Sequence, residues 1–278
     1  MSKVWFITGC STGFGRELSK QVLKLGHRVA VTSRNTDDVK DIVAQYPDTA
    51  IAIKLDVTRP AEIKTAVEQA MNTFKRIDVL VNNAGIGYFG AIEESEEVEV
   101  RRMFEINFFG LANTTKEVLP VMRKQRSGHI VNISSIGGLV AFPAVGFYNA
   151  TKFAVTGYSE ALAKETQHLG IKVTVVAPSG FRTDRAGRSA NNSKIVIDDY
   201  ITTAGANKDT IRGYSGNQPG DPVKAAQAII NAVESANPPL RLLLGVGALK
   251  GARNKITELQ KDYDAWEATT IGADFPKQ

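Results

Sequence analysis

The 278-residue sequence has very little cysteine, little histidine and no long apolar run. Its one cysteine, Cys10, excludes an internal disulfide framework and is typical of a protein from a reducing compartment. The three histidines are dispersed without metal-ligand spacing, so neither a metal site nor a catalytic histidine constellation is predicted. No stretch approaches the roughly 18 apolar residues of a membrane span, and the first apolar run is too short for a signal-peptide core. We therefore expect a cytoplasmic protein with no membrane partner.

Basic residues are in slight excess, with 34 Lys and Arg against 29 Asp and Glu. They are scattered along the chain, with small groups only at Arg101-Arg102 and at 123–126. A nucleic-acid partner would require a concentrated basic stripe, so none is expected, and these charges are interpreted as solvated helix faces. The length and the 43% hydrophobic content suffice for one large domain with a buried core.

Short β-branched runs alternate with longer amphipathic stretches along the chain. Strands are predicted at 3–8, 28–33, 50–56, 78–81, 129–134, 172–177 and 240–244. Helices are predicted at about 14–25, 61–74, 97–125, 149–168 and 222–236, with a weaker one at about 36–45. The strands are nearly continuous apolar runs, which indicates burial on both faces and hence a parallel sheet between helices. The sequence therefore predicts a single-domain α/β protein with a doubly wound Rossmann fold and a seven-stranded, mainly parallel sheet.

Two segments leave this alternation. Residues 184–220 are polar, contain five Gly and one Pro, and are interpreted as a long loop. Because ligands of open α/β sheets bind at the carboxyl ends of strands, this loop is a candidate substrate lid. The tail, residues 250–278, has a helical pattern at about 252–267 and is expected to serve packing or subunit contact. Both segments are assigned to one dinucleotide-binding and catalytic domain, residues 1–278.

A glycine-rich turn, 8-TGCSTGFG-15, follows the first predicted strand and opens the first predicted helix. The fingerprint G-x-G-x-x-G is not met, because Leu18 stands where the third glycine is expected. The spacing is instead Gly9-x-x-x-Gly13-x-Gly15. Such a backbone lets a pyrophosphate approach the N–H groups at a helix N-terminus, where the helix dipole is favourable. We interpret the turn as a phosphate site; the alternative is a merely tight turn between strand and helix.

The end of the second predicted strand bears on the choice between NAD and NADP. A carboxylate there would accept a hydrogen bond from the adenine ribose 2′-hydroxyl and favour NAD. This chain has Ser33 followed by Arg34, a hydroxyl and a cation that suit a 2′-phosphate. NADP(H) is therefore preferred and NAD(H) stays possible, since Thr12 provides no second cation within the glycine turn.

Taken in order, these features strongly resemble the short-chain dehydrogenase/reductase family. The matching residues are 8-TGCSTGFG-15, 56-DV-57, 82-NNAG-85, Asn107, 130-IVNISS-135, 148-YNATK-152 and 178-PSGFRT-183. The family requires thirteen residues from the serine to the tyrosine, the distance between Ser135 and Tyr148 here. The TGxxxGxG spacing, together with YxxxK, is similar to the shorter, reductase-rich branch of the family.

The resemblance implies where a nicotinamide cofactor binds. Asp56 and Val57 would border the adenine, and Thr183 would bond the nicotinamide carboxamide. The family commonly has Pro-Gly where this chain has Pro178-Ser179-Gly180, which leaves open which backbone groups touch the nicotinamide. The full set of cofactor-binding residues expected is Gly9, Ser11, Thr12, Gly13, Phe14, Gly15, Ser33, Arg34, Asp56, Val57, Asn83, Ala84, Gly85, Tyr148, Lys152, Pro178, Gly180, Phe181 and Thr183.

Four residues, Asn107, Ser135, Tyr148 and Lys152, are the candidate catalytic set. Tyr148 and Lys152 stand at i and i+4, so one helical face presents both. A phenol with a pKa of about 10 is a poor acid–base catalyst at neutral pH, and a nearby ammonium lowers that pKa. The resemblance implies that Lys152 also bonds the nicotinamide ribose, that Ser135 stabilises the substrate oxygen, and that Asn107 holds a water in a proton relay.

The sequence thus predicts an NADPH-dependent carbonyl reductase that transfers a hydride to a ketone or aldehyde and acts reversibly as an alcohol dehydrogenase. Phe89, the segment 137–147 with Leu139, Val140, Phe142 and Val145, and the lid are candidate walls of an apolar pocket for an aromatic or lipophilic substrate. An NAD-dependent hydroxysteroid or alcohol dehydrogenase and a non-catalytic NADP-sensing protein are the alternatives. The resemblance further implies a homodimer or homotetramer assembled through the helices at 97–125 and 149–168.

Overall fold

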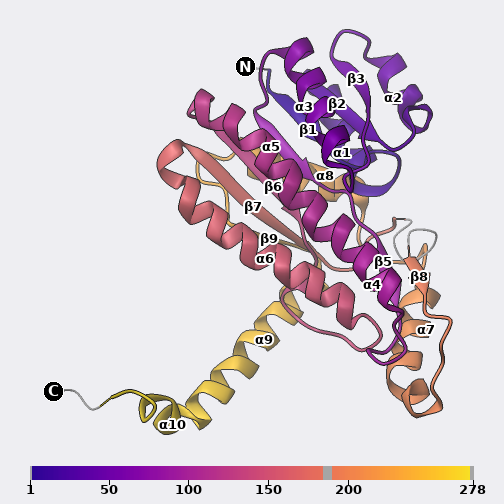
Figure 1. Ribbon diagram of the computed structural model, residues 1–278, viewed down its shortest axis with the longest axis vertical. Helices are drawn as coiled ribbons and strands as arrows, with labels where there is room; N and C mark the ends of the chain where they lie inside the picture. Colours follow the sequence, from indigo (N-terminus) through magenta and orange to yellow (C-terminus); the bar gives the residue numbers. More distant parts are fainter. Residues whose placement is uncertain (1, 184–189, 276–278) are drawn as a thin grey trace.

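The computed structural model describes residues 2–183 and 190–275. Its centre is a seven-stranded sheet in the order β3-β2-β1-β4-β6-β7-β9, in which every strand pairing is parallel (Figure 1). The order reverses on either side of β1, which is the arrangement of a doubly wound sheet. The strands are β1 (Val4–Ile7), β2 (Arg28–Ser33), β3 (Ala50–Lys54), β4 (Val79–Asn82), β6 (Gly128–Ile133), β7 (Ile171–Pro178) and β9 (Arg241–Leu244). The predicted fold is confirmed, with strand limits within about two residues of those expected.

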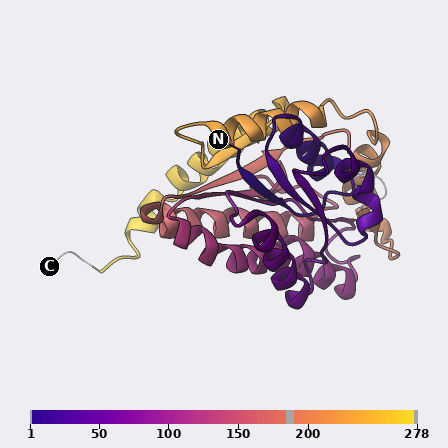
Figure 2. The ribbon, with the colours of Figure 1, turned by 90° about the horizontal axis from the view of Figure 1, so that it is seen from above.

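Helices cover both faces of this sheet, as the view from above shows (Figure 2). They are α1 (Gly13–Lys24), α2 (Lys40–Gln45) and α8 (Pro222–Glu234) on one face, and α3 (Pro60–Phe74), α5 (Gly110–Gln125) and α6 (Gly146–Thr166) on the other. Successive residues of β1 alternate between the two layers: Trp5 and Ile7 pack toward α1 and α8, whereas Val4 and Phe6 pack toward α3 and α5. Burial on both faces explains why the strands are continuous apolar runs.

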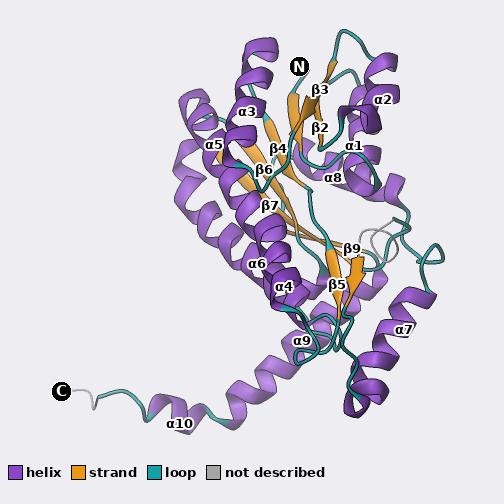
Figure 3. Ribbon diagram, turned by 45° about the vertical axis from the view of Figure 1, so that its right-hand side comes forward, coloured by secondary structure: helices purple, strands orange, loops and turns teal. Residues whose placement is uncertain are grey.

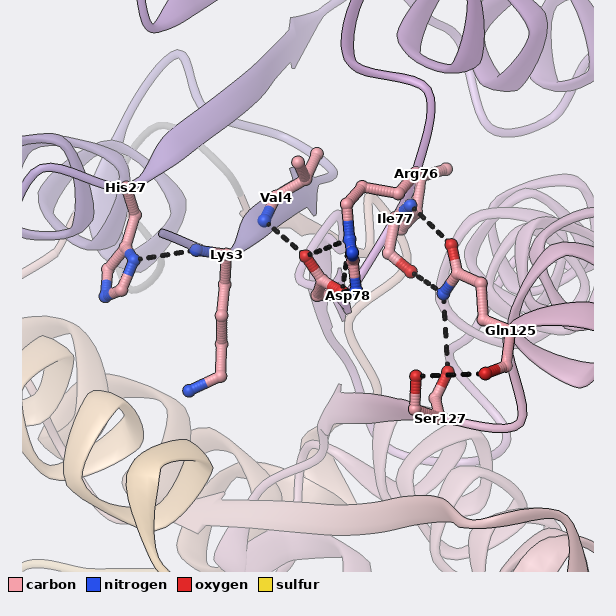
Figure 4. Close-up of polar contacts among 8 residues, drawn as sticks. All are labelled: Lys3, Val4, His27, Arg76, Ile77, Asp78, Gln125 and Ser127. Carbon is pink, nitrogen blue, oxygen red and sulfur yellow. Dashed lines mark hydrogen bonds and ion pairs between the residues drawn. The ribbon is translucent and has the colours of Figure 1, made fainter. Parts of the chain in front are cut away.

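Polar side chains tie together the amino-terminal edge of the sheet (Figure 4). Asp78, just before β4, accepts a hydrogen bond from the Val4 N–H at 2.8 Å and forms an ion pair with Arg76 at 2.6 Å. Gln125, at the end of α5, accepts from the Ile77 N–H at 3.2 Å and donates to the Ile77 carbonyl at 2.8 Å. These bonds satisfy backbone groups at the edge opposite the glycine turn, and so they stabilise the fold without facing the site.

The predicted helix at 97–125 is helical over that whole range, and it consists of α4 (Glu97–Phe104), a π turn, Glu105–Phe109, with Asn107 at its centre, and α5. The prediction of a loop at 184–220 is wrong in detail. The predicted loop contains β8 (Ala190–Asn192), a 3₁₀ turn (Asp198–Tyr200), a π turn (Ile201–Gly205) and α7 (Ala206–Gly213). A short strand, β5 (Gly87–Phe89), pairs with β8 in a second, two-stranded sheet. Residues 184–189 of the predicted lid lie outside the described residues.

The tail forms α9 (Val246–Ala265) and α10 (Glu267–Ile271), which extend away from the body of the molecule (Figure 1 and Figure 3). In the described part of the chain, no helix is both long and apolar enough to cross a membrane.

Candidate functional site

A cavity of about 830 Å³ opens at the carboxyl ends of the central strands. Its walls come from the segments that follow β1, β2, β3, β4, β6 and β7, and from residues between 191 and 219. Every predicted site residue except Gly15 and Asn107 lines it. Sequence motifs that are more than 170 residues apart, from Gly9 to Thr183, therefore meet at one edge of the sheet, as expected for a doubly wound fold.

The glycine turn forms one end of the cavity. Gly9 and Gly13 have φ angles of +71° and +59°, a region that residues with a side chain rarely adopt. Gly15 lies beneath the turn: a Cβ there would meet the Gly9 carbonyl oxygen at 2.4 Å and Asn83 Nδ2 at 2.5 Å. The Asn83 amide in turn donates to the carbonyls of Thr8 and Gly9 at 2.9 and 2.8 Å. Gly15 thus permits close packing, and the N-terminus of α1, where Thr12 makes no side-chain cap bond, faces the cavity with N–H groups oriented for an anion.

Ser33, Arg34 and Asp56 lie together farther along the same wall. The Ser33 hydroxyl is buried and donates to the Asn35 carbonyl at 2.5 Å, whereas Arg34 is exposed. Burial raises the pKa of Asp56, but hydrogen bonds from the Thr58 N–H and hydroxyl, with the charges of Arg34 and Arg59, outweigh it and lower the pKa below its ordinary value. This wall therefore holds both a cation and an ionised carboxylate.

Ser135 and Tyr148 approach each other across Gly137. Ser135 directly follows β6 and Ser134, and its Oγ accepts a hydrogen bond from the Gly137 N–H at 3.0 Å, a bond that leaves its own proton unused. A Cβ placed on Gly137 would lie 3.3 Å from Tyr148 Cε1 and 3.4 Å from Ser135 Oγ. Tyr148 comes from the first turn of α6 and is only 8% exposed. A glycine at position 137 therefore lets the two hydroxyl-bearing side chains share one wall of the cavity.

Lys152 follows one helical turn after Tyr148, with its Nζ 5.9 Å from the centre of the tyrosine ring. The side chain is 2% exposed, and its Nζ donates to the Ile133 carbonyl at 2.8 Å. Burial lowers the pKa of Lys152 to about 8, so the residue still carries its positive charge at neutral pH. A nearly buried cation thus lies close to the tyrosine ring.

Asn107 lies behind the cavity wall. Its Oδ1 accepts from the Ile86 N–H at 2.8 Å, and its Nδ2 donates to the Ile86 carbonyl at 3.0 Å and to Thr151 Oγ1 at 3.2 Å. A Cβ on Gly85 would lie 3.2 Å from Asn107 Oδ1 and 3.8 Å from Lys152 Nζ. The structure therefore brings Asn107 next to Lys152, and the π turn around it is of a kind often found at functional sites.

The other end of the cavity is only partly as predicted. Phe89, Phe142 and Val145 line it, whereas Leu139 and Val140 do not; Val140 lies beside Gly251 of α9 instead. The predicted lid does contribute a wall, through Asn207, Thr210, Ile211 and Tyr214, but sequence analysis missed the helix, α7, that presents them. Their spacing of i, i+3, i+4 and i+7 is that of one helical face, but its mixed polarity hides the pattern that reveals an amphipathic helix.

Acidic side chains attach the start of this wall to the loop after β5. Glu94 accepts from the N–H groups of Ile197 and Ala91 at 2.9 and 2.8 Å, and these bonds lower its pKa. Glu96 accepts from the Tyr88 hydroxyl and from the Lys194 N–H, and these bonds lower its pKa to about 2. The segment that precedes α7 is therefore held by charge-assisted hydrogen bonds.

The described residues contain no group of three or more His, Cys, Asp or Glu side chains placed to hold a metal ion. Cys10 belongs to the glycine turn, and its side chain is buried, which raises the pKa of the thiol to about 11. A thiol in that environment is inert, so Cys10 is a packing residue.

Residues 3–194 match the family model described as short chain dehydrogenase. An oxidoreductase of Botryotinia fuckeliana, BOA17, is 35% identical over 274 residues, which cover 98% of this chain and 100% of that protein. A 3-ketodihydrosphingosine reductase of Bacteroides thetaiotaomicron is 40% identical over 244 residues, which cover 87% of this chain and 88% of that protein.

Solved structures show the same likeness. A short-chain dehydrogenase from Streptomyces avermitilis superposes with a TM-score of 0.93 at 40% identity, over 99% of this chain and 100% of that one. ElxO with NADP bound has a TM-score of 0.74 at 29% identity, over 90% of this chain and 100% of that one. A 3-ketoacyl-(acyl-carrier-protein) reductase from Brucella melitensis in complex with NADH has a TM-score of 0.73 at 27% identity, over 87% of this chain and 96% of that one.

Proposed function

We propose, from the premise that this chain belongs to the short-chain dehydrogenase/reductase family, that it is an NADPH-dependent carbonyl reductase. The observation that carries the proposal is the meeting of Ser135, Tyr148 and Lys152 on one wall of the cavity that the glycine turn also enters. Two of these side chains are hydroxyl donors and the third is a buried cation. That set is suited to protonating an oxygen on which negative charge develops.

In this proposal a bound nicotinamide dinucleotide supplies the hydride that reduces the carbonyl carbon. Ser135 donates a hydrogen bond to the carbonyl oxygen, and Tyr148 transfers its phenolic proton to that oxygen, which becomes the alcohol. Lys152 stabilises the resulting phenolate by its charge. Asn107, placed behind Gly85 and beside Lys152, belongs to the route by which a proton returns to the tyrosine. In the reverse direction Tyr148 acts as the base.

The preference for NADP(H) rests on Arg34, an exposed cation at the end of β2. A 2′-phosphate there would gain a charge-assisted contact with the guanidinium. The proteins of similar structure bind either NADP or NADH according to their descriptions, so the likeness supports a nicotinamide cofactor of either kind.

One observation favours the NAD-dependent alternative, a hydroxysteroid or alcohol dehydrogenase. The Ser33 hydroxyl already donates to the Asn35 carbonyl, and the ionised Asp56 lies near Arg34. A 2′-phosphate would have to share Arg34 with that carboxylate. Comparing NADPH with NADH therefore separates the two candidate functions.

The substrate class that we propose is a lipophilic or aromatic ketone. Phe89, Phe142, Val145 and Ile211 supply an apolar surface, while Asn207 and Thr210 supply polar groups that orient a ligand. The similarity to a protein described as a 3-ketodihydrosphingosine reductase supports a ketone on an apolar chain. The described part of the 184–220 segment would act as the lid, and α4, α5 and α6 as a subunit interface of a homodimer or homotetramer.

The test is the loss of the near-ultraviolet absorbance of NADPH or NADH when the purified protein meets aryl ketones, α-keto esters, long-chain 3-ketones and aldehydes. We expect NADPH to be oxidised faster than NADH, and Tyr148→Phe to abolish turnover while NADPH binding, followed by its fluorescence, is retained. Faster turnover with NADH would overturn the cofactor preference alone. Tight NADPH binding without turnover of any carbonyl would instead support a non-catalytic, NADP-sensing protein.

A further inference from the structure

The tail helix α9 has large apolar side chains in water. Its start packs on the body: Ala248 is fully buried, and a Cβ on Gly251 would lie 3.3 Å from the Ile136 side chain. Beyond that point the helix runs clear of the body (Figure 1 and Figure 3). There Ile256 is 67% exposed and Trp266 is 66% exposed. A soluble protein rarely leaves such residues along one extended element unless another surface covers them.

The apolar residues of α9 repeat with a coiled-coil period. The row is Leu249, Ala252, Ile256, Leu259 and Tyr263, followed by Trp266 directly after the end of α9, and we call it the tail seam. The steps between its members are three, four, three, four and three residues, so the seam occupies a and d positions of successive heptads. An apolar stripe this narrow is typical of a helix that packs against one other helix, whereas a helix on a broad core has a wider apolar face.

The charges of α9 are arranged against its own dipole. Positive charges stand in the first half, at Lys250, Arg253 and Lys255, and negative charges prevail in the second half, at Glu258, Asp262 and Asp264 against Lys261. A helix dipole favours the reverse order. The one ion pair described within α9, between Lys255 and Glu258, is at the surface and contributes little. The arrangement is therefore not explained by the stability of the isolated helix.

We infer that the tail seam binds the tail seam of a second copy of this chain in an antiparallel pair. A two-fold axis perpendicular to the helix makes the pair antiparallel, whereas an axis along the helix makes it parallel, so the charges decide between the two arrangements. Antiparallel pairing places the basic first half of each helix against the acidic second half of the other. A parallel pair would instead set like charges beside one another.

The register follows from the volumes of the seam residues. Pairing Ile256 of one copy with Leu259 of the other sets Ala252 opposite Tyr263, and Leu249 opposite Trp266. The small alanine then makes room for the aromatic ring, as interdigitating layers require. The same register sets Lys255 of one copy opposite Asp262 of the other, both at positions that flank an antiparallel seam.

Light scattering coupled to size exclusion tests the contact on the full chain over a dilution series. Ile256→Glu places a charge in the seam and is expected to halve the molar mass of the assembly. Thr257→Glu, an exposed neighbour outside the seam, is the matched control and is expected to keep the wild-type mass. Circular dichroism of both variants checks that the fold is intact. A monomeric wild type, or an equal mass for the two variants, would overturn the inference.

Engineered cysteines test the antiparallel register even if a second interface holds the assembly together. Cys10 is fully buried, so new surface thiols are the reactive ones. Leu249→Cys and Trp266→Cys are prepared separately and then mixed under mild oxidation. The two thiols meet only in the mixture, because like positions are about 25 Å apart along an antiparallel pair. We expect a disulfide dimer in the mixture and none in either variant alone. Cross-linking of each variant with itself, or no cross-link in the mixture, refutes the register.

Discussion

Replacing Lys152 by methionine tests the electrostatic part of the proposed mechanism. The Lys152 Nζ lies 5.9 Å from the centre of the Tyr148 ring, in a nearly buried position. At that distance a unit charge interacts with a phenolate by about 3 kcal/mol for an effective dielectric constant of about 20. Since one pKa unit corresponds to about 1.4 kcal/mol, Lys152 is expected to lower the pKa of the tyrosine by about 2 units.

The alcohol-oxidising direction reports this effect, because there Tyr148 must act in its ionised form. The rate constant kcat/KM rises with pH until the phenol is ionised. In Lys152→Met we expect the rise to be displaced by about 2 pH units to higher pH, so that the rate at neutral pH falls about 100-fold. The pKa of Lys152, about 8, means that the wild-type residue is charged where this comparison is made.

Two controls separate the charge from the other role proposed for Lys152, contact with the cofactor. Lys152→Arg keeps a cation and is expected to keep the wild-type pH midpoint, although its bulkier head lowers the rate. Cofactor dissociation constants, measured by fluorescence, correct the rates for weakened binding. If the profile of Lys152→Met is scaled down but keeps the wild-type midpoint, Lys152 does not act on Tyr148 through its charge.

Three further predictions use the same preparations. Arg34→Ala is expected to raise KM for NADPH by about 10- to 100-fold, the value of one charged hydrogen bond, and to leave KM for NADH nearly unchanged; equal effects on both would exclude a 2′-phosphate contact. Ser135→Ala is expected to lower kcat by about 100-fold without changing NADPH affinity, whereas a loss of binding would make Ser135 a structural residue. Burial lowers the pKa of His129 to about 4, so the wild type should lose about 3 kcal/mol of unfolding free energy as pH falls from 6.5 to 4, a loss that denaturant titration should find absent in His129→Phe.

The physical reason for the His129 prediction is specific. Its Nε2 contacts Thr174 Oγ1 at 2.9 Å, and that hydroxyl already donates to the Pro239 carbonyl, so Nε2 must carry the proton. The second ring nitrogen, Nδ1, is buried without a partner in the described residues. Protonation would place a charge there that nothing accepts, whereas the unfolded chain binds that proton readily.

The sequence by itself determined the features that local chemistry controls. Strands buried on both faces must be apolar along their whole length, so the seven strands could be located from composition alone. Gly9 and Gly13 could be recognised from their spacing after the first strand. Their positive φ angles explain why glycine stands there, since other residues rarely adopt them. Ser135, Tyr148 and Lys152 could be proposed because their order and spacing resemble the family's motifs, and the structure brings all three to the cavity.

Only the tertiary structure decided what each side chain meets. Leu139 and Val140 are as apolar as Val145, yet they lie outside the cavity wall, and Val140 lies beside Gly251 of α9 instead. The face of α7 that lines the cavity carries both polar and apolar side chains, because it faces ligand space rather than the apolar core. No apolar stripe therefore marks this helix in the sequence. Likewise the heptad spacing of apolar residues in α9 is present in the sequence, but a helix buried in the core can have the same spacing. That its outer residues face water follows from the path of the chain, since exposure depends on which elements pack together rather than on local sequence.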